Sequence, residues 1–165
     1  MTSKSDRERT GALTRREWVT LMAGGALAAL AVPLRGAAAS EAPPRMTVYK
    51  SPTCGCCKAW VERVKSAGFA VTVKDMPDVE PTKRTMRVPE KLWSCHTAIV
   101  GGYTLEGHVP PDLVLKLLRE RPKAAGLAVP GMPAGSPGME VGGMKDPYDV
   151  VLFLSDGRSR VYAKR

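Results

Sequence analysis

The order of apolar and polar residues over residues 46–73 predicts a strand, a helix and a second strand. Apolar and polar side chains alternate over residues 46–50, which is typical of a half-buried strand, and the Ser-Pro-Thr run that follows ends it. Apolar residues then recur at helical spacing from Cys57 to Ala67, before Gly68. Residues 69–73 form the second short strand. The helix therefore begins just after the first strand and its turn.

Farther along, the pattern predicts two hairpins, a helix and two less regular segments. Residues 77–85 are polar and punctuated by proline, so we expect a loop or broken helix, followed by a short helix at 85–92 that Pro89 interrupts. The regular elements expected after it are a hairpin at 97–100 and 103–105 with a Gly101-Gly102 turn, a helix from Pro110 that ends before Pro122, and a closing hairpin at 148–154 and 158–162.

Residues 126–147 interrupt this order with closely spaced prolines and glycines. No helix or strand is expected in such a run, so the sequence predicts a long irregular loop. Met132, Met139 and Met144 are spaced along it. Methionines usually fill gaps against a core, but a thioether is also a soft ligand for monovalent copper, so both roles are open.

The first 39 residues resemble an export signal of the twin-arginine type. Arg15-Arg16 precedes a mildly apolar run at 19–32, which is shorter than the roughly 20 residues of a membrane-spanning helix. Ala37-Ala38-Ala39 suits a signal peptidase, although an ordinary alanine-rich helix is the alternative. We expect cleavage after Ala39, no membrane anchor afterwards, and a periplasmic or otherwise extracytoplasmic domain at 40–165. The twin-arginine route carries folded cargo, which would allow a metal to be loaded before export.

The charge of the chain does not indicate nucleic-acid binding. Of the formal +9, the leader carries +3, from six basic and three acidic side chains, which leaves +6 for residues 40–165. The basic residues are dispersed among acidic ones, with no dense basic run and no interleaved aromatic residues. The length of this part suits a single domain.

All four cysteines lie in two short segments. Cys54, Cys56 and Cys57 fall within four residues, and Cys95 stands directly before His96. Cys54 and Cys57 have the Cys-x-x-Cys spacing of thioredoxin-like sites, at a helix start where the dipole stabilises a thiolate. We therefore predict a thioredoxin-like α/β fold, with helices flanking the sheet, a long Pro/Gly/Met loop and a C-terminal β-hairpin.

The third thiol and the Cys-His pair argue against simple dithiol chemistry. If the two segments meet, up to four thiolates and one imidazole crowd a small volume, where like charges repel unless they are protonated, oxidised or neutralised by cations. Soft sulfur ligands favour monovalent copper, zinc or iron–sulfur centres. Two structural disulfides, or a closed zinc site of four sulfurs or of three with His96, are the alternatives.

The two histidines are candidates for a role beside the sulfurs. His96 is a candidate ligand, or a hydrogen-bond partner that orients a thiolate, and otherwise a packed histidine. His108 follows the first hairpin and is a candidate ligand or gate, although a histidine in a turn is commonplace. We expect Trp60 and Trp93 to pack over the sulfur site.

Four motifs of this chain resemble the periplasmic copper-resistance proteins of the CopG type. The resemblance covers nearly all of residues 46–163 and is specific because the motifs occur together, whereas a lone Cys-x-x-Cys would be weak. The motifs that carry it are Tyr49-Lys50-Ser51-Pro52-Thr53-Cys54-Gly55-Cys56-Cys57, Ser94-Cys95-His96-Thr97, Gly107-His108-Val109-Pro110, and the loop segments 126–133 and 135–140.

The resemblance implies a thioredoxin-like fold whose cysteines bind copper as a thiolate-bridged cluster. We expect an extracytoplasmic protein that holds Cu(I) in a polynuclear site and supports copper resistance; whether it is also a copper oxidoreductase stays open. Its expected partners are copper ions and either a copper exporter or a periplasmic electron-transfer protein. The alternatives are a thiol-disulfide oxidoreductase and a non-catalytic copper chaperone. The candidate metal ligands are Cys54, Cys56, Cys57 and Cys95, followed by His96, His108, Met132 and Met139.

Overall fold

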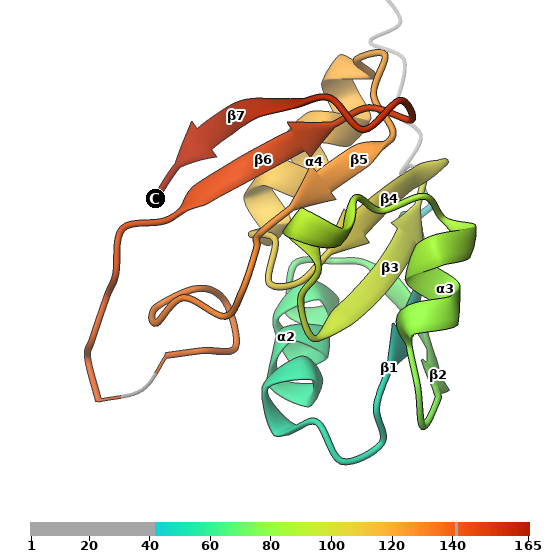
Figure 1. Cartoon of the computed structure of the whole chain (residues 1–165). Coiled ribbons are helices and arrows are strands. Elements are labelled where there is room, and N and C mark those ends of the chain that lie inside the picture. Colours follow the sequence, from blue (N-terminus) through green and yellow to red (C-terminus); the bar gives the residue numbers. More distant parts are fainter. Residues whose placement is uncertain (1–41, 141) are drawn as a thin grey trace, which may run out of the picture. The chain divides into compact units, whose positions relative to one another are not determined.

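Seven strands form one mixed sheet in the order β2-β1-β3-β4-β5-β6-β7 (Figure 1). This computed structural model describes residues 42–140 and 142–165, so the predicted signal peptide and its cleavage site lie outside the described residues. The strands are β1 (Arg45–Lys50), β2 (Ala70–Asp75), β3 (His96–Val100), β4 (Tyr103–Glu106), β5 (Gly126–Ala128), β6 (Asp149–Phe153) and β7 (Ser159–Lys164). The helices are α2 (Gly55–Ser66), α3 (Glu80–Thr85), α4 (Pro111–Glu120) and the short 3₁₀ helix η1 (Glu90–Leu92).

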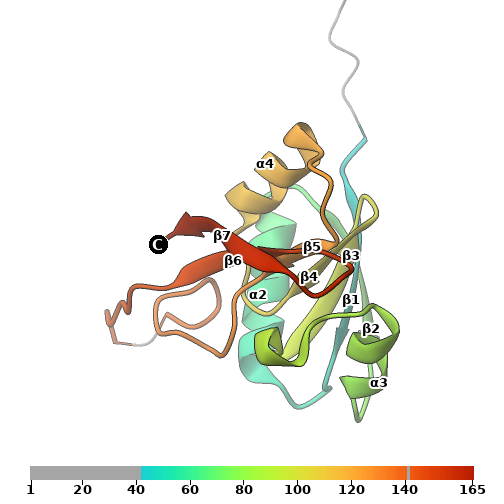
Figure 2. The same cartoon turned by 45° about the horizontal axis from the view of Figure 1, so that its top comes forward.

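The first four strands and their helices have the thioredoxin-like α/β arrangement that the sequence predicts. Strands β1 and β2 are parallel and are connected through α2, whereas β3 is antiparallel to both β1 and β4. The strands β5 to β7 then extend the sheet beyond β4. Helices α2 and α4 lie on one face, and α3 and η1 lie toward the other (Figures 1 and 2).

The main core lies between the sheet and the helices α2 and α4. In β1, alternate residues point inward because successive side chains of a strand face opposite sides. Trp60 and Val64 of α2 and Leu117 of α4 are fully buried against it. Burying a large apolar side chain stabilises a fold by roughly 1.5–3 kcal/mol, so these helices are held by packing. In the described part of the chain, every helix is too short or too polar to cross a bilayer.

A smaller core on the opposite face explains why β5 forms, which corrects the prediction of an unbroken loop from residue 126. Ala128 and Phe153 pack there with Val88 and Leu92, while Leu127 faces the main core. Strand β5 pairs with β4 on one side and β6 on the other. A three-residue strand buried on both faces owes its conformation to these neighbours, and no local pattern reveals it.

The segment between β2 and β3 also differs from the prediction. The first part contains a regular helix, α3, because Pro81 stands in its first turn, where a missing amide hydrogen is tolerated. The short helix expected at 85–92 does not form as predicted: Arg87 has a φ of 53°, and only the 3₁₀ turn η1 follows Pro89. Proline therefore starts elements here instead of breaking them.

The loop after β5 is fixed to the start of α2 through Gly138. This residue has a φ of 87°, and a Cβ atom placed on it would lie 2.7 Å from Trp60 N and 2.8 Å from Cys56 O. Both atoms belong to the main chain of α2 and cannot move aside without disturbing the helix. The absence of a side chain at this position therefore permits the contact.

We predict that Gly138→Ala destabilises the protein more than Gly143→Ala does. Both residues have positive φ, at 87° and 76°, so both substitutions carry the strain of a left-handed backbone, about 1–2 kcal/mol. Only Gly138 adds a clash, since nothing lies within 4 Å of a Cβ at Gly143, and overpacking costs about 1–3 kcal/mol more. Urea unfolding of the two variants measures the difference. Equal losses of unfolding free energy would contradict the close approach of loop and helix.

Candidate metal centre

The register of β1 and β3 brings the two cysteine segments together. Lys50, the last residue of β1, lies opposite His96, the first residue of β3. The turn that follows β1 and the residue that precedes β3 therefore lie at the same end of the sheet. As a result, Cys54, at the N-cap of α2, and Cys95 come from positions far apart in the sequence and meet in space.

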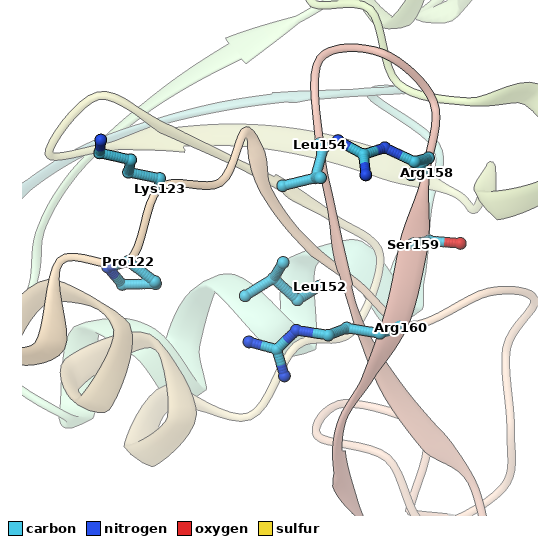
Figure 3. Close-up of a pocket in the computed structure, with 7 residues that line it drawn as sticks. All are labelled: Pro122, Lys123, Leu152, Leu154, Arg158, Ser159 and Arg160. Atoms are coloured by element: carbon cyan, nitrogen blue, oxygen red, sulfur yellow. The ribbon is translucent and has the colours of Figure 1, made fainter.

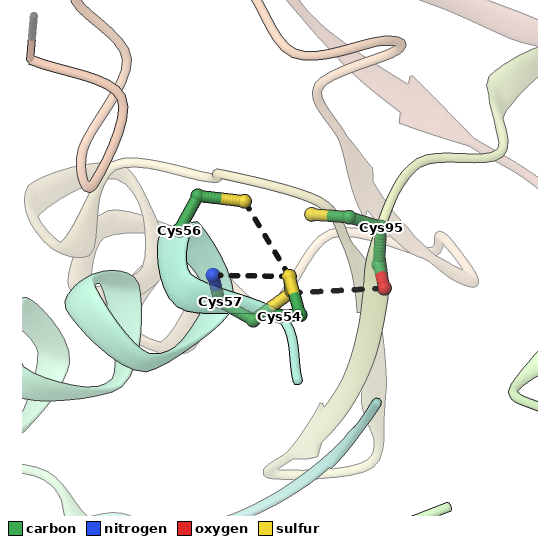
Figure 4. A group of neighbouring side chains, drawn as sticks. All are labelled: Cys54, Cys56, Cys57 and Cys95. Atoms are coloured by element: carbon green, nitrogen blue, oxygen red, sulfur yellow. Dashed lines mark hydrogen bonds between the residues drawn. A yellow bond between two sulfur atoms is a disulfide. The ribbon is translucent and has the colours of Figure 1, made fainter. Parts of the chain in front are cut away.

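The four sulfurs form one cluster, in which all the Sγ atoms lie within 4.8 Å of one another (Figure 4). Cys54 and Cys57 are joined by a disulfide bond, and Cys56 and Cys95 are free thiols. The Cys56 thiol lies 3.4 Å from Cys54 Sγ and is the donor, because a disulfide sulfur carries no proton. Cys57 is fully buried, whereas the other three are partly exposed. The expected meeting of Cys95 with the three-cysteine turn is therefore observed.

One of these sulfurs caps the N-terminus of α2. Cys54 Sγ accepts a hydrogen bond from the Cys57 amide at 3.3 Å, which satisfies one of the free amides of the first helical turn. No acidic side chain lies in that turn. The positive end of the helix therefore faces the sulfur cluster.

Both histidines of the chain contact the Cys95 sulfur. His96 Nδ1 lies 3.2 Å from Cys95 Sγ, and His108 Nε2 lies 3.0 Å from it. His108 Nδ1 donates to the Pro137 carbonyl at 2.7 Å, because a carbonyl oxygen can only accept. The other nitrogen of His108 is then an acceptor, and the Cys95 thiol donates to it. The structure therefore places the predicted candidates His96 and His108 within hydrogen-bonding distance of one thiol.

The metal-free site holds little charge. Burial raises the pKa of the Cys95 thiol to about 12, and the nearby Cys56 adds to the effect. Burial also lowers the pKa of His96 well below its ordinary value, with further contributions from His108 and Lys83. The pKa of His108 is lowered for the same first reason. A protonated thiol thus faces two neutral imidazoles, whose lone pairs are available to a cation.

One atom of the site is left without a partner. His96 is fully buried, and its Nε2 has no hydrogen-bond partner among the described residues. The His96 ring packs against Trp60, with ring centroids 4.4 Å apart, and Trp60 shields this side from water as predicted. An unsatisfied buried nitrogen lowers the stability of the fold by about 1–3 kcal/mol. Such nitrogens are rare in native structures, and a site for a ligand is one explanation for them. The imidazole nitrogens that face Cys95, together with the thiols, form a donor set that fits a soft metal ion.

A buried ion pair supports the Cys95 segment from behind. Lys83 Nζ lies 2.6 Å from Glu106 Oε1, and both side chains are almost completely buried. Thr97 Oγ1 accepts from Lys83 at 3.0 Å and donates to Glu106 at 2.7 Å. The amide of Ser94 donates to the same carboxylate at 2.6 Å, which fixes the backbone directly before Cys95. Removing one partner of such a pair costs about 3–5 kcal/mol, so the segment has little freedom.

The sequence analysis did not find this pair. Ser94 and Thr97 stand in the Cys-His motif, and Glu106 lies opposite Thr97 in the β3–β4 register. A buried Thr-Glu pair at the open end of a hairpin is a recognisable signal once that register is known. Lys83 offers no such signal, because it belongs to a helix and has no strand register with the motif.

The loop methionines differ in their surroundings. Met132 lines a cleft of about 490 Å³ that Cys95 also lines. Met139 is partly exposed, and its main chain forms hydrogen bonds within the loop, to Ser136 and Gly135. Met132 and Met144 have exposed fractions of 54% and 60%, so these two do not fill the core in the usual manner of methionine.

A second cavity lies away from this chemistry. It measures about 400 Å³ and lies between the segment after α4 and the β6–β7 hairpin (Figure 3). Leu152 and Leu154 line it, together with the cationic side chains of Lys123, Arg158 and Arg160. No thiol or imidazole reaches it, so the metal chemistry belongs to the sulfur cluster.

Comparisons with known proteins place this site in context. Residues 92–139 match a family model described as a protein of unknown function, DUF411. Two solved structures of copper resistance protein copG, forms 1 and 2, are each 43% identical to this chain, with a TM-score of 0.71. Each alignment covers 74% of this chain and 98% of the solved one. No curated protein matches the chain.

We predict that both imidazoles of the metal-free protein protonate at lower pH in the folded state than in the unfolded chain, because burial lowers the pKa of each below the ordinary 6.5. Below that pH the two histidines of the unfolded chain bind more protons than those of the folded protein. The free energy of unfolding therefore falls as the pH drops below 6.5, by up to about 1.4 kcal/mol per pH unit for each histidine. Because the chain has two histidines, NMR resolves each titration. A folded-state pKa at or above that of the urea-unfolded chain would contradict the buried, uncharged site.

Proposed function

The chain belongs to the family of the copper resistance protein CopG, and on this basis we propose that it binds monovalent copper in the cluster of Cys54, Cys56, Cys57 and Cys95. The observation that carries the proposal is that all four sulfurs of this chain lie within 4.8 Å of one another. The chain is also 43% identical to a copper resistance protein. Thiolates that bridge metal ions allow several soft cations to share so small a volume. The proposal therefore includes a polynuclear site.

The chemistry around Cys95 supports a cationic ligand. Its thiol is kept protonated by burial, so a soft cation that binds there replaces the proton and neutralises the thiolate. His108 presents an unprotonated nitrogen to the same point, and His96 Nδ1 lies 3.2 Å from the same sulfur. We infer that these imidazoles are ligands, or partners that orient the bound thiolate. Met139, which no contact places at the sulfurs, stays a predicted ligand.

The disulfide makes copper capacity dependent on the oxidation state of the protein. Formation of the Cys54–Cys57 bond from two thiols releases two electrons and two protons, and it leaves Cys56 and Cys95 as the thiols of the site. Reduction of this bond restores four thiols. An electron-transfer partner could thereby control copper loading, and a copper exporter could receive the released ion. Both partners belong to the proposal, as does an extracytoplasmic location after cleavage of the leader.

We predict that copper uptake follows the thiol count. The unfolded protein should show two titratable thiols as oxidised and four after reduction. Anaerobic loading of the reduced protein should give more copper per chain, with sulfur ligation and short metal–metal distances in X-ray absorption at the copper edge. The oxidised protein is the matched control, since its sequence is identical.

In the same assay, Cys95→Ser should weaken Cu(I) binding by at least about tenfold, because it removes the sulfur that joins both imidazoles to the cluster. Competition with a chromophoric Cu(I) chelator measures the affinity. Substoichiometric copper on the reduced protein, together with unchanged binding by Cys95→Ser, would rule out the proposed site.

The disulfide also favours a second candidate function, thiol-disulfide exchange. Cys54 is the partly exposed sulfur and Cys57 the fully buried one, so Cys54 would attack a substrate disulfide and Cys57 would resolve the mixed disulfide. In this role neither Cys56 nor Cys95 takes part in bond formation. This two-cysteine mechanism does not require the adjacent free thiols or imidazoles, which is why copper binding is the first proposal.

Insulin reduction distinguishes the two functions. If the protein is mainly a copper-binding protein, we predict that neither the wild type nor the variant Cys56→Ser speeds the reduction of insulin. Its rate should equal that with dithiothreitol alone. Cys57→Ser would then fail to accumulate a mixed disulfide at Cys54 with a model disulfide peptide. Fast, Cys54-dependent insulin reduction that Cys56→Ser leaves intact would make exchange the primary activity.

A further inference from the structure

The cleft beside Cys95 connects the sulfur cluster with the protein surface. Its volume of about 490 Å³ exceeds what a single ion requires, and Cys95 lies in its wall, partly exposed. Met132 lies in the same wall and is 54% exposed. The rest of the lining comes from α3 and the segment before it and from the segments next to η1 and β5, and includes Asp78, Glu80, Lys83, Ser94 and Gly131.

The position of Met132 next to this opening is set by its neighbours. The Ser94 hydroxyl donates a hydrogen bond to the carbonyl of Gly131, so the residues directly before Cys95 and directly before Met132 are tied together. Gly131 has a φ of 68°, which turns the chain at that point. Met132 gains little from burial here, so packing does not account for its apolar side chain at the opening.

The charges of the cleft favour a cation. Asp78 and Glu80 line it, although the domain carries a net positive charge of +6 beyond the leader. Lys83 is also in the lining, but its amine is paired with Glu106 and nearly buried. The Glu80 carboxylate lies 3.5 Å from Arg84, a surface pair that is largely screened. Carboxylates near an opening raise the local concentration of cations.

We infer that Met132 and Cys95 form an entry site, at which one monovalent copper ion is received from a donor before it joins the four-sulfur cluster. The inference rests on the proposed function. The transfer is a ligand exchange: a donor–copper bond breaks as a thioether–copper bond forms, and the Cys95 sulfur then replaces the thioether as its proton leaves to solvent. Copper keeps its charge and no electrons move. A thioether suits this step because it is a soft, neutral ligand that needs no deprotonation.

The test compares Met132→Leu with Met144→Leu. Both residues are exposed methionines of the same loop, but Met144 does not line the cleft, and leucine preserves size while removing sulfur. Reduced, metal-free protein is mixed anaerobically with the cuprous complex of bicinchoninate, and the loss of its colour gives the loading rate. We expect Met132→Leu to load about tenfold more slowly, with the final copper content of the wild type. Met144→Leu should load at the wild-type rate.

The outcomes separate the entry site from the proposed function. If Met132→Leu loads as fast as Met144→Leu and reaches the same copper content, the entry site is wrong and copper binding stands. If Met132→Leu lowers the final copper content, Met132 is a permanent ligand, and the entry role is likewise overturned. A wild-type protein that takes no copper from the complex would remove both inferences.

Discussion

The alignment of β1 with β3 is the constraint on which the site depends. The sheet places the end of one strand beside the beginning of the other, so a turn with three cysteines faces a fourth that is far away in sequence. A shift of register by one residue would turn each of His96 and Thr97 to the face opposite the one that it now occupies. The imidazole and the hydroxyl would then both lose their partners. The main core and the buried Lys83–Glu106 pair both act to preserve this alignment.

Burial at the site has opposite effects on the protein and on its ligand. Without a metal, the low polarity around Cys95 keeps the thiol protonated and the two imidazoles neutral, so the fold does not have to accommodate free charge. The same low polarity strengthens the attraction between a thiolate and a cation once the proton has left. The orphaned Nε2 of His96 shows that hydrogen bonding within the protein alone does not satisfy this pocket.

The sequence predicted those parts of the structure that local patterns determine. The strand, helix and strand around the Cys-x-x-Cys turn and the two hairpins are confirmed, because alternation, helical spacing and Gly-Gly or Asp-Gly turns are local signals. The missed elements, β5 and the buried pair, depend on contacts between distant segments. The grouping of Cys54, Cys56 and Cys57 follows from their spacing, whereas the meeting with Cys95 was a hypothesis that depends on the β1–β3 register. The Cys54–Cys57 disulfide was one of several open states.

The long loop is attached to the site almost entirely through its main chain. The carbonyls of Gly131 and Pro137 accept hydrogen bonds from Ser94 and His108, and Gly138 allows backbone to meet backbone at α2. Exposed side chains such as that of Met132 can therefore vary without loosening these main-chain contacts, whereas Ser136 is buried and donates to the Pro133 carbonyl. Natural or laboratory evolution could change which molecules deliver copper to this protein by exchanging a few exposed loop residues. The arrangement of the cysteines and histidines would stay unchanged.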